Sequence, residues 1–203
     1  MKFGGSILSS KEDLQRIAML VKERREKEEI CAVVSALKGV TDLLIQASEE
    51  AINGDTSIKK FLANLREMHL GLILGLEKKE ARIEATKKLN EKLAILEKAL
   101  YGINYLGELS ERSKAVIYTF GERLSAILLE GYLVDAGLDT CLVEANEVIV
   151  TDSCFSTASP DMKKTAGKAK ELGKMLKENT VVVTGYLAAD EAGIITCLGR
   201  GGS

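Results

Sequence analysis

The first 36 residues, MKFGGSILSSKEDLQRIAMLVKERREKEEICAVVSA, decide the fold. Met1–Phe3 predicts the end of a short strand, and Gly4-Gly5-Ser6 makes a turn directly after it. The stretch 11–28 has apolar residues at helical spacing. The run 30–36 is apolar and rich in valine, which is typical of a parallel strand buried on both faces. Strand, glycine turn, helix and strand form a βαβ unit, so the sequence predicts an α/β fold.

The remaining chain is expected to combine helices with short strands. Helices are expected at 41–53, in two antiparallel segments within 57–101, at 113–136 and at 161–177. Strands are expected at 140–143, 148–151, 180–184 and 194–198. The block 57–101 shows no strand pattern and no cluster of chemically active residues, which favours an inserted helical hairpin that packs beside the sheet or forms an oligomer contact. No linker or repeat divides the chain, so one compact α/β domain is the simplest interpretation.

Composition and charge exclude several functional classes. The chain has 203 residues, of which 46% are apolar and 29% charged, as in an ordinary globular domain. Its net charge of −2 lacks the basic footprint of a nucleic-acid-binding protein. No apolar run approaches the roughly 18 to 20 residues that span a bilayer, and no secretory signal opens the chain. We therefore expect a cytoplasmic protein with no nucleic acid or membrane partner.

The four cysteines and the single histidine form no recognisable metal site. Cys31, Cys141, Cys154 and Cys197 are widely spaced, and no pair has the two-to-four-residue gap of a zinc knuckle. Reduced, buried thiols are the favoured interpretation over a metal or disulfide role. Without a second histidine, His69 offers neither a metal site nor a Ser-His-Asp triad, and we interpret it as structural.

The glycine turn after the first strand is the first candidate for chemistry. Gly4 and Gly5 allow the backbone to approach a ligand closely, and successive N–H groups at such a turn bind phosphate oxygens. Lys2 beside them would supply a cation to a transferring phosphoryl group. The pattern is neither a Walker A loop nor a dinucleotide fingerprint, so a purely structural turn is an open alternative.

Two further candidates follow along the chain. Ser35 and Thr41 come after the second strand, at the sheet edge where open α/β folds bind ligands, although a helix cap or a turn would explain each equally. Gly121 interrupts an apolar helix at a cost of about 1 kcal/mol against alanine, which indicates that something approaches closely there. Glu122 beside it could bind a substrate ammonium group or could form a surface pair with Arg123.

The last candidate is the C-terminal segment LGRGGS, residues 198–203, which follows a predicted strand. A glycine loop with Arg200 suits bidentate binding of a carboxylate or a phosphate. The alternative is a linker of non-natural origin, because Gly-Gly-Ser is also a common linker sequence.

Together these segments resemble the aspartate kinase family, within the wider amino-acid kinase fold. The resemblance rests on KFGGS (2–6), SA with GVTDLL (35–36 and 39–44), FGERLS (120–125), VTD (150–152), TGY (184–186) and LGRGGS (198–203). They run from one end of the chain to the other in the family's order, and the last match favours a functional loop over a linker. The resemblance implies a three-layer αβα fold with a mainly parallel central sheet, here its N-terminal lobe, plus a helical hairpin inserted at about 57–101.

The resemblance also implies an activity, the ATP-dependent phosphorylation of the aspartate side-chain carboxylate to 4-phospho-aspartate, which is the first step of lysine, threonine and methionine biosynthesis. It implies ATP with Mg²⁺ bridging its phosphates, no metal bound by the protein itself, and a homo-oligomer. Lys2 would be catalytic and would bind the ATP phosphates together with Gly4, Gly5 and Ser6. The residues implied to bind the substrate are Ser35, Thr41, Glu122, Arg200 and Ser203.

Two departures from the family pattern shape this expectation. Only Met1 precedes Lys2, where the family has a fuller first strand, and the sequence stops at Ser203. In the family an aspartate follows, and then the half that holds the ATP base and ribose and the small regulatory domains. We therefore expect residues 1–203 to be the N-terminal, amino-acid-binding part of the catalytic domain, without the ATP-binding half and the regulatory domains, and to show little or no turnover alone.

Two alternatives stay open. One is another enzyme of the same fold, such as an acetylglutamate, glutamate or uridylate kinase, against which the segment 121–125 and the long helical insert argue. The other is a non-catalytic binding or assembly module, which the missing ATP half favours for the isolated chain.

Overall fold

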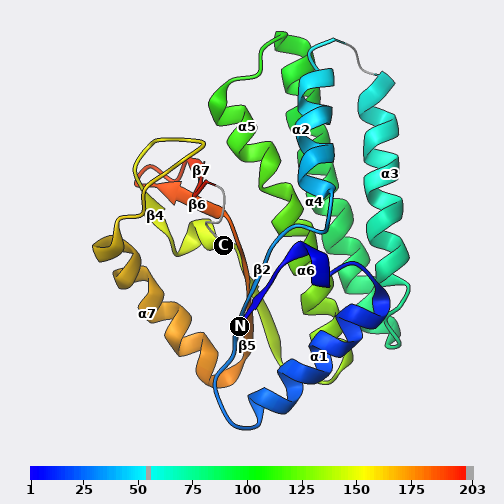
Figure 1. Ribbon diagram of the computed structural model, residues 1–203, viewed down its shortest axis with the longest axis vertical. Helices are drawn as coiled ribbons and strands as arrows, with labels where there is room; N and C mark the ends of the chain where they lie inside the picture. Colours follow the sequence, from blue (N-terminus) through cyan, green and yellow to red (C-terminus); the bar gives the residue numbers. More distant parts are fainter. Residues whose placement is uncertain (54–55, 200–203) are drawn as a thin grey trace.

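Four parallel strands form the central sheet, in the order β1-β2-β5-β3. The computed structural model describes residues 1–53 and 56–199 (Figure 1). The strands are β1 (Lys2–Phe3), β2 (Cys31–Val34), β5 (Thr180–Thr184) and β3 (Thr140–Val143). All residues of β5 are buried, and β5 pairs in parallel with β2, with Val183 in register with Val33. The predicted α/β class is confirmed, because β-branched runs suit strands that are covered on both faces.

A second, smaller sheet contains β4 (Val150–Thr151), β6 (Leu187–Asp190) and β7 (Ile195–Cys197). β6 pairs in parallel with β4 and antiparallel with β7. The sequence did not predict β6, because its residues LAAD include no β-branched or aromatic side chain. The turn between β6 and β7 is fixed by the Asp190 carboxylate, which accepts hydrogen bonds from the N–H groups of Ala192 (3.0 Å) and Ile194 (2.9 Å).

Helices cover both faces of the central sheet and give the expected three layers (Figure 1). On one face lie α1 (Lys11–Arg25) and α6 (Phe120–Asp135), and on the other lies α7 (Met162–Glu178). Every residue of α6 from Phe120 to Leu133 is buried, so α6 is the central helix of the main core. By contrast, α7 has no buried residue and touches the sheet only through partly buried side chains.

The long helical block forms the expected hairpin of α3 (Thr56–Ile73) and α4 (Lys79–Leu106). Leucines of α4 at three- and four-residue spacing are buried in the main core. The turn between the two helices is held by Asp135 at the end of α6, whose carboxylate accepts hydrogen bonds from the N–H groups of Glu77 (2.9 Å) and Lys78 (2.7 Å). Together with α2 (Val40–Glu50) and α5 (Glu111–Tyr118), the hairpin packs around α6 beside the sheet (Figure 1).

The single helix predicted for 113–136 is wrong, because the structure divides this stretch into α5 and α6 at Thr119. The Thr119 hydroxyl is buried and donates a hydrogen bond to the Val116 carbonyl at 2.7 Å. The apolar period continues across the break, so periodicity alone gave no signal for it. As a result Gly121 and Glu122 lie in the first turn of α6, where backbone N–H groups are unsatisfied within the helix, and not in a helix interior.

The cysteines and His69 have the surroundings of structural residues, with one exception. Cys31 and Cys141 are half-buried and Cys197 is buried, whereas Cys154 is exposed, which the interpretation as buried thiols missed. All four belong to the described part of the chain, and none forms a disulfide there. His69 is buried in α3, with its Nδ1 atom 2.7 Å from the Leu65 carbonyl oxygen.

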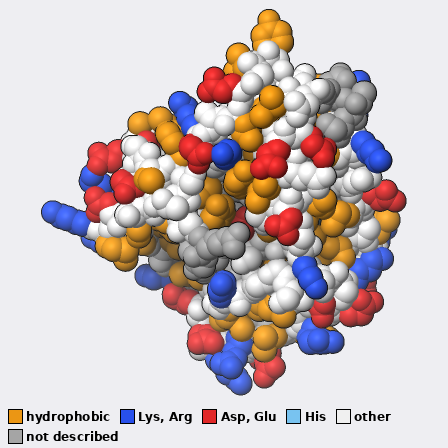
Figure 2. All heavy atoms as spheres, turned by 45° about the horizontal axis from the view of Figure 1, so that its top comes forward, with side chains coloured by type: hydrophobic (Ala, Val, Ile, Leu, Met, Phe, Trp, Pro, Cys, Tyr) orange, Lys and Arg blue, Asp and Glu red, His pale blue; other side chains and the backbone are white. Residues whose placement is uncertain are grey.

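The distribution of surface charge and the apolar character of the helices are relevant to binding of nucleic acids and membranes. Figure 2 shows acidic and basic side chains interspersed over the visible face, with apolar side chains between them. This face therefore shows no large patch of one sign, the kind that attracts a polyanion. None of the helices in the described ranges combines the length and the apolar character that a membrane crossing requires.

Candidate functional site

Three loops meet at the carboxyl edge of the central sheet. Backbone hydrogen bonds hold them together, since the Ser35 N–H donates to the Phe3 carbonyl (3.0 Å) and the Gly185 N–H donates to the Val34 carbonyl (2.7 Å). The residues that follow β1, β2 and β5 therefore leave the sheet side by side. This is the edge at which open parallel sheets bind ligands.

Ala36 is the point where two glycines bring these loops and α6 into contact. A Cβ atom on Gly5 would lie 2.3 Å from the Ala36 carbonyl oxygen, and one on Gly121 would lie 2.5 Å from the Ala36 Cβ. Neither position has space for a side chain without movement of the backbone. The glycine turn after β1 and the first turn of α6 are thus both pressed against the loop after β2.

Glu122 is the buried acid of this site. Its side chain is 6% exposed and lies in the first turn of α6, close to the N–H groups of Ala36 and of its own residue. Burial raises the pKa of the Glu122 carboxyl to about 7, and the two N–H groups only partly oppose this. Its Oε2 atom has no hydrogen-bond partner among the described residues. A buried carboxylate with an unused oxygen is suited to accept a hydrogen bond from a ligand cation.

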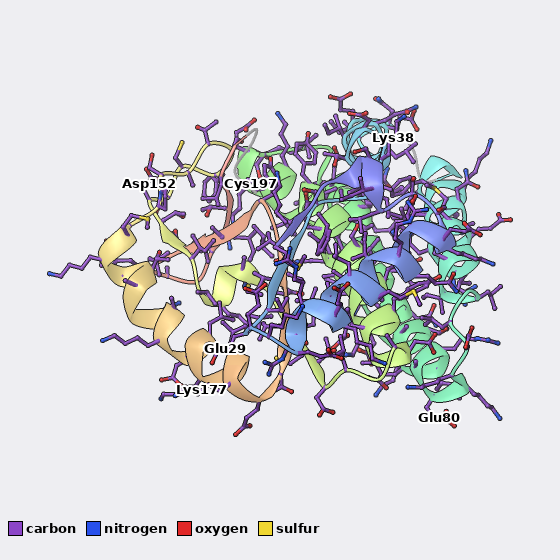
Figure 3. All side chains as sticks on the ribbon, turned by 60° about the horizontal axis from the view of Figure 1, so that its bottom comes forward. Glu29, Lys38, Glu80, Asp152, Lys177 and Cys197 are labelled. Atoms are coloured by element: carbon purple, nitrogen blue, oxygen red, sulfur yellow. The ribbon has the colours of Figure 1, made fainter. Side chains whose placement is uncertain are left out.

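Tyr186 and Cys197 flank Glu122. Tyr186 is the one non-glycine residue in the described ranges with a positive φ, at 62°, a strained conformation of the kind that collects at functional sites. Its side chain lies beside the Cys197 thiol and near Glu122, and burial raises the pKa of the Tyr186 hydroxyl. Burial also raises the pKa of the Cys197 thiol to about 11. Cys197 lies on β7 next to α5, where its thiol donates to the Ala115 carbonyl (3.5 Å; Figure 3).

Comparison with known proteins assigns the family. The model of the amino acid kinase family matches residues 1–203. The chain belongs to the amino acid kinase family. It is 36% identical over 204 residues to an aspartokinase of Chlamydia muridarum, covering all of this chain and 42% of that protein. It is 33% identical over 217 residues to the chloroplastic aspartokinase 2 of Arabidopsis thaliana, covering 37% of that protein. The chain therefore spans less than half the length of these relatives.

A solved structure shares the fold of this amino acid kinase family chain. It is E. coli aspartokinase III in complex with aspartate and ADP, with a TM-score of 0.82 at 24% identity. The superposition covers 99% of this chain and 43% of the E. coli chain. At this identity the likeness supports the architecture, and it agrees with the predicted amino-acid kinase fold.

Within this family member, the structure brings several predicted site residues to one place. Gly4, Gly5 and Ser35 follow neighbouring strands at the carboxyl edge, and Glu122 reaches the same edge from α6. Thr41 lies in the first turn of α2, shortly after Ala36, and is half-buried.

Other predicted residues are peripheral or not described. Lys2 is exposed and, by the alternation of side chains along a strand, faces the side of the sheet opposite to the buried Phe3. Ser6 is exposed in the short 3-10 helix Gly5–Ile7. Arg200 and Ser203 lie outside the described residues.

Sequence reasoning did not assign roles to Ala36, Tyr186 or Cys197. The role of Ala36 depends on its contacts with Gly5 and Gly121, which are distant in sequence, so the sequence around it does not predict the role. The sequence TGY likewise does not predict the positive φ of Tyr186. Across the described ranges, no three His, Cys, Asp or Glu side chains gather where they could hold a metal ion.

Proposed function

We propose that this chain is the amino-acid-binding part of an aspartate kinase, which transfers the γ-phosphoryl group of ATP to the side-chain carboxylate of aspartate. The observation that carries the proposal is the buried Glu122 carboxyl, which has an unused oxygen at the carboxyl edge of the sheet. Aspartokinases similar along the entire chain support the choice of aspartate over another acceptor.

Each end of aspartate has a proposed partner. The ammonium group binds to the Glu122 carboxylate. Burying this carboxylate alone is costly, and the ammonium group offsets the cost by pairing with it. Ser35 and Thr41 offer hydroxyl groups near the same edge. Arg200, assisted by Ser203, is assigned to a substrate carboxylate, because a guanidinium binds a carboxylate through two parallel hydrogen bonds.

The glycine turn is assigned to the ATP phosphates. Gly5 must stay close to Ala36, whereas a Cβ on Gly4 would have no atom within 4 Å, so the backbone at Gly4 is open to a ligand. The N–H groups at the start of a short helix have no partner inside it and point outward. Gly4, Gly5 and Ser6 would thus contact phosphate oxygens, Lys2 would neutralise charge, and Mg²⁺ supplied with ATP would offset further phosphate charge.

The transfer itself requires positioning more than covalent help from the protein. A carboxylate oxygen of aspartate attacks the γ-phosphorus, the bond from that phosphorus to the bridging oxygen breaks, and 4-phospho-aspartate and ADP result. Because the chain spans less than half of its relatives, we assign to it the binding of aspartate and of the ATP phosphates, and not the whole catalytic cycle.

Calorimetric titration of the chain with aspartate tests this proposal. We expect aspartate to bind, N-acetyl-aspartate to bind much more weakly because it lacks the ammonium group, and N-acetylglutamate not to compete. Glu122→Gln should weaken aspartate binding by about 30-fold, the usual loss when a charged hydrogen bond is removed. Glu130→Gln is the matched control on the same helix. Unchanged affinity in Glu122→Gln, or tighter binding of N-acetylglutamate than of aspartate, would contradict the proposal.

A further inference from the structure

Arg123, the residue after Glu122, is buried and held from two directions. The residue is 8% exposed, and its Nη2 atom lies 3.2 Å from the Oε2 atom of Glu144. Its guanidinium carbon lies 5.2 Å from the ring centroid of Phe120, within the range of a cation–π contact. Burying a guanidinium is costly unless it is paired with a carboxylate in good geometry. The presence of a buried arginine in the first turn of α6 therefore calls for an explanation.

Glu144 connects this arginine to two other parts of the molecule. It follows β3, and its second carboxylate oxygen pairs with the Lys92 ammonium of α4. The next residue, Ala145, donates its N–H to the Thr184 hydroxyl at 2.8 Å, and Thr184 is the last residue of β5 before the site loop with Tyr186. Glu144 is therefore anchored to the sheet edge that carries the site and to the helical hairpin.

The first turn of α6 lacks the usual means of fixing a helix start. Thr119 makes no side-chain capping hydrogen bond, although capping typically stabilises a helix by about 1 kcal/mol. Gly121 adds backbone freedom in the same turn. The Arg123–Glu144 pair is thus the ion pair that ties this turn to the segment after β3, in addition to the contact of Glu122 with the Ala36 N–H.

We propose that Arg123 is a positioning residue, which through its pair with Glu144 fixes the first turn of α6 and so holds the Glu122 carboxyl against Ala36. Lys92 extends the same connection to the hairpin of α3 and α4, so that the hairpin contributes to the geometry of the site. The inference rests on the proposed function of Glu122.

A second ion pair provides a matched control. Lys88 of α4 pairs with Glu130 of α6 at 2.7 Å, and Glu130 is also 8% exposed. This pair joins the same two helices, about two turns farther along α6, away from Glu122. If both ion pairs only stabilise the fold, removing either pair should change aspartate affinity to a similar extent. If Arg123 positions Glu122, only the loss of the Arg123–Glu144 pair should lower aspartate affinity.

The test uses Arg123→Met, Glu144→Gln and Glu130→Gln in the full chain. Arg123→Met keeps an unbranched apolar stem but removes the guanidinium, and with it the pair with Glu144 and the cation–π contact with Phe120, and it leaves Glu144 paired with Lys92. We expect Arg123→Met and Glu144→Gln to weaken aspartate binding by about tenfold, since small displacements of a binding group have effects of this order or larger. Glu130→Gln should stay within about twofold of the wild type at a comparable melting temperature, and Arg123→Lys should restore part of the affinity.

An NMR titration of the ¹³C-labelled Glu122 carboxyl gives a readout that is independent of aspartate. Removing a nearby cation by itself raises the pKa of a carboxyl, whereas a loosened turn admits water and lowers a pKa that burial has raised. We expect a lower Glu122 pKa in Arg123→Met. An unchanged or higher pKa with wild-type affinity would overturn the inference. If the wild type binds no aspartate, the proposed function fails, but the titration still decides the role of Arg123. If Arg123→Met does not fold, Glu144→Gln, which removes the same pair from the other side, is judged in the same way.

Discussion

The two ends of α6 differ in burial and in how their polar groups are satisfied. The N-terminal residues are buried, whereas Val134 near the C-terminal end is 37% exposed. At the C-terminal end, the Tyr132 hydroxyl donates to the Leu72 carbonyl (2.8 Å), and the Asp135 carboxylate accepts two backbone hydrogen bonds. At the N-terminal end, side-chain atoms of Glu122, Arg123 and Ser125 have no partner among the described residues. Unsatisfied buried groups are rare and costly, so their occurrence at the N-terminal end supports the proposal that a ligand binds there.

Replacing each of the two glycines of α6 by alanine tests this comparison, and the variant at Gly121 has the largest expected effect on stability. A Cβ on Gly121 would meet the Cβ of Ala36 at 2.5 Å, which cannot move without its backbone, whereas one on Gly131 would meet the Leu76 Cδ1 at 3.2 Å, the end of a flexible side chain. Gly121→Ala should lower the free energy of unfolding by about 2 to 3 kcal/mol. Gly131→Ala should be within about 1 kcal/mol of the wild type, because helix propensity offsets the crowding. Urea unfolding of both variants measures the difference, and equal losses would show that the N-terminal end is not specially packed.

A pH titration of stability is the second test. The pKa of Glu122 is raised from 4.5 to about 7, so the folded state binds this proton more tightly than the unfolded state. The resulting stabilisation is present below pH 4.5 and is lost as the pH rises through about 7. Tyr186 and Cys197, which face Glu122, have raised pKa values and stay neutral in this window. Glu122→Gln should therefore be more stable than the wild type by about 3 kcal/mol at pH 8, with the gap closing toward pH 4.5.

The same titration separates stability from binding. Aspartate needs the ionised form of Glu122 for its ammonium group, so affinity should rise as the pH increases through about 7 while stability falls. Calorimetry in buffers of different ionisation enthalpy should show proton release on binding. Parallel trends of affinity and stability with pH would argue against Glu122 as the ammonium partner.

The C-terminal end of α6 gives the smallest expected effect. Asp135→Ala removes the acceptor of the Glu77 and Lys78 N–H groups at the start of α4 and should lower the free energy of unfolding by about 1 kcal/mol. Aspartate affinity should not change, because this end of the helix is remote in sequence and contacts from Glu122. Thermal unfolding and calorimetry measure the two quantities, and a loss of affinity would show that the ends of α6 are coupled.

The sequence predicted most of the secondary structure because local patterns determine it. Valine runs marked β2 and β5, and helical periods marked the hairpin. The break at Thr119 and the strand β6 were missed, because an apolar period crosses the first and no β-forming residue marks the second.

The candidate site was predictable only in part. Gly5, Ser35 and Glu122 were selected as candidates because glycine after a strand and an acid beside a helical glycine are local signals, and the structure places them at one edge of the sheet. The contacts at Ala36 and the pair Arg123–Glu144 arise between distant segments, and no local pattern reports which segments will meet. The roles of Arg200 and Ser203 stay predictions.

Helix α7, on the other face of the central sheet, is much less buried than α6. Since no residue of α7 is buried, few apolar contacts oppose its detachment, and its backbone amides are expected to exchange with solvent deuterium through local opening long before those of α6. Such an opening would expose one face of β5 while the other face, with Glu122 and its neighbours, stays folded. The proposed binding site is thus expected to lie in a part of the chain that exchanges more slowly than α7.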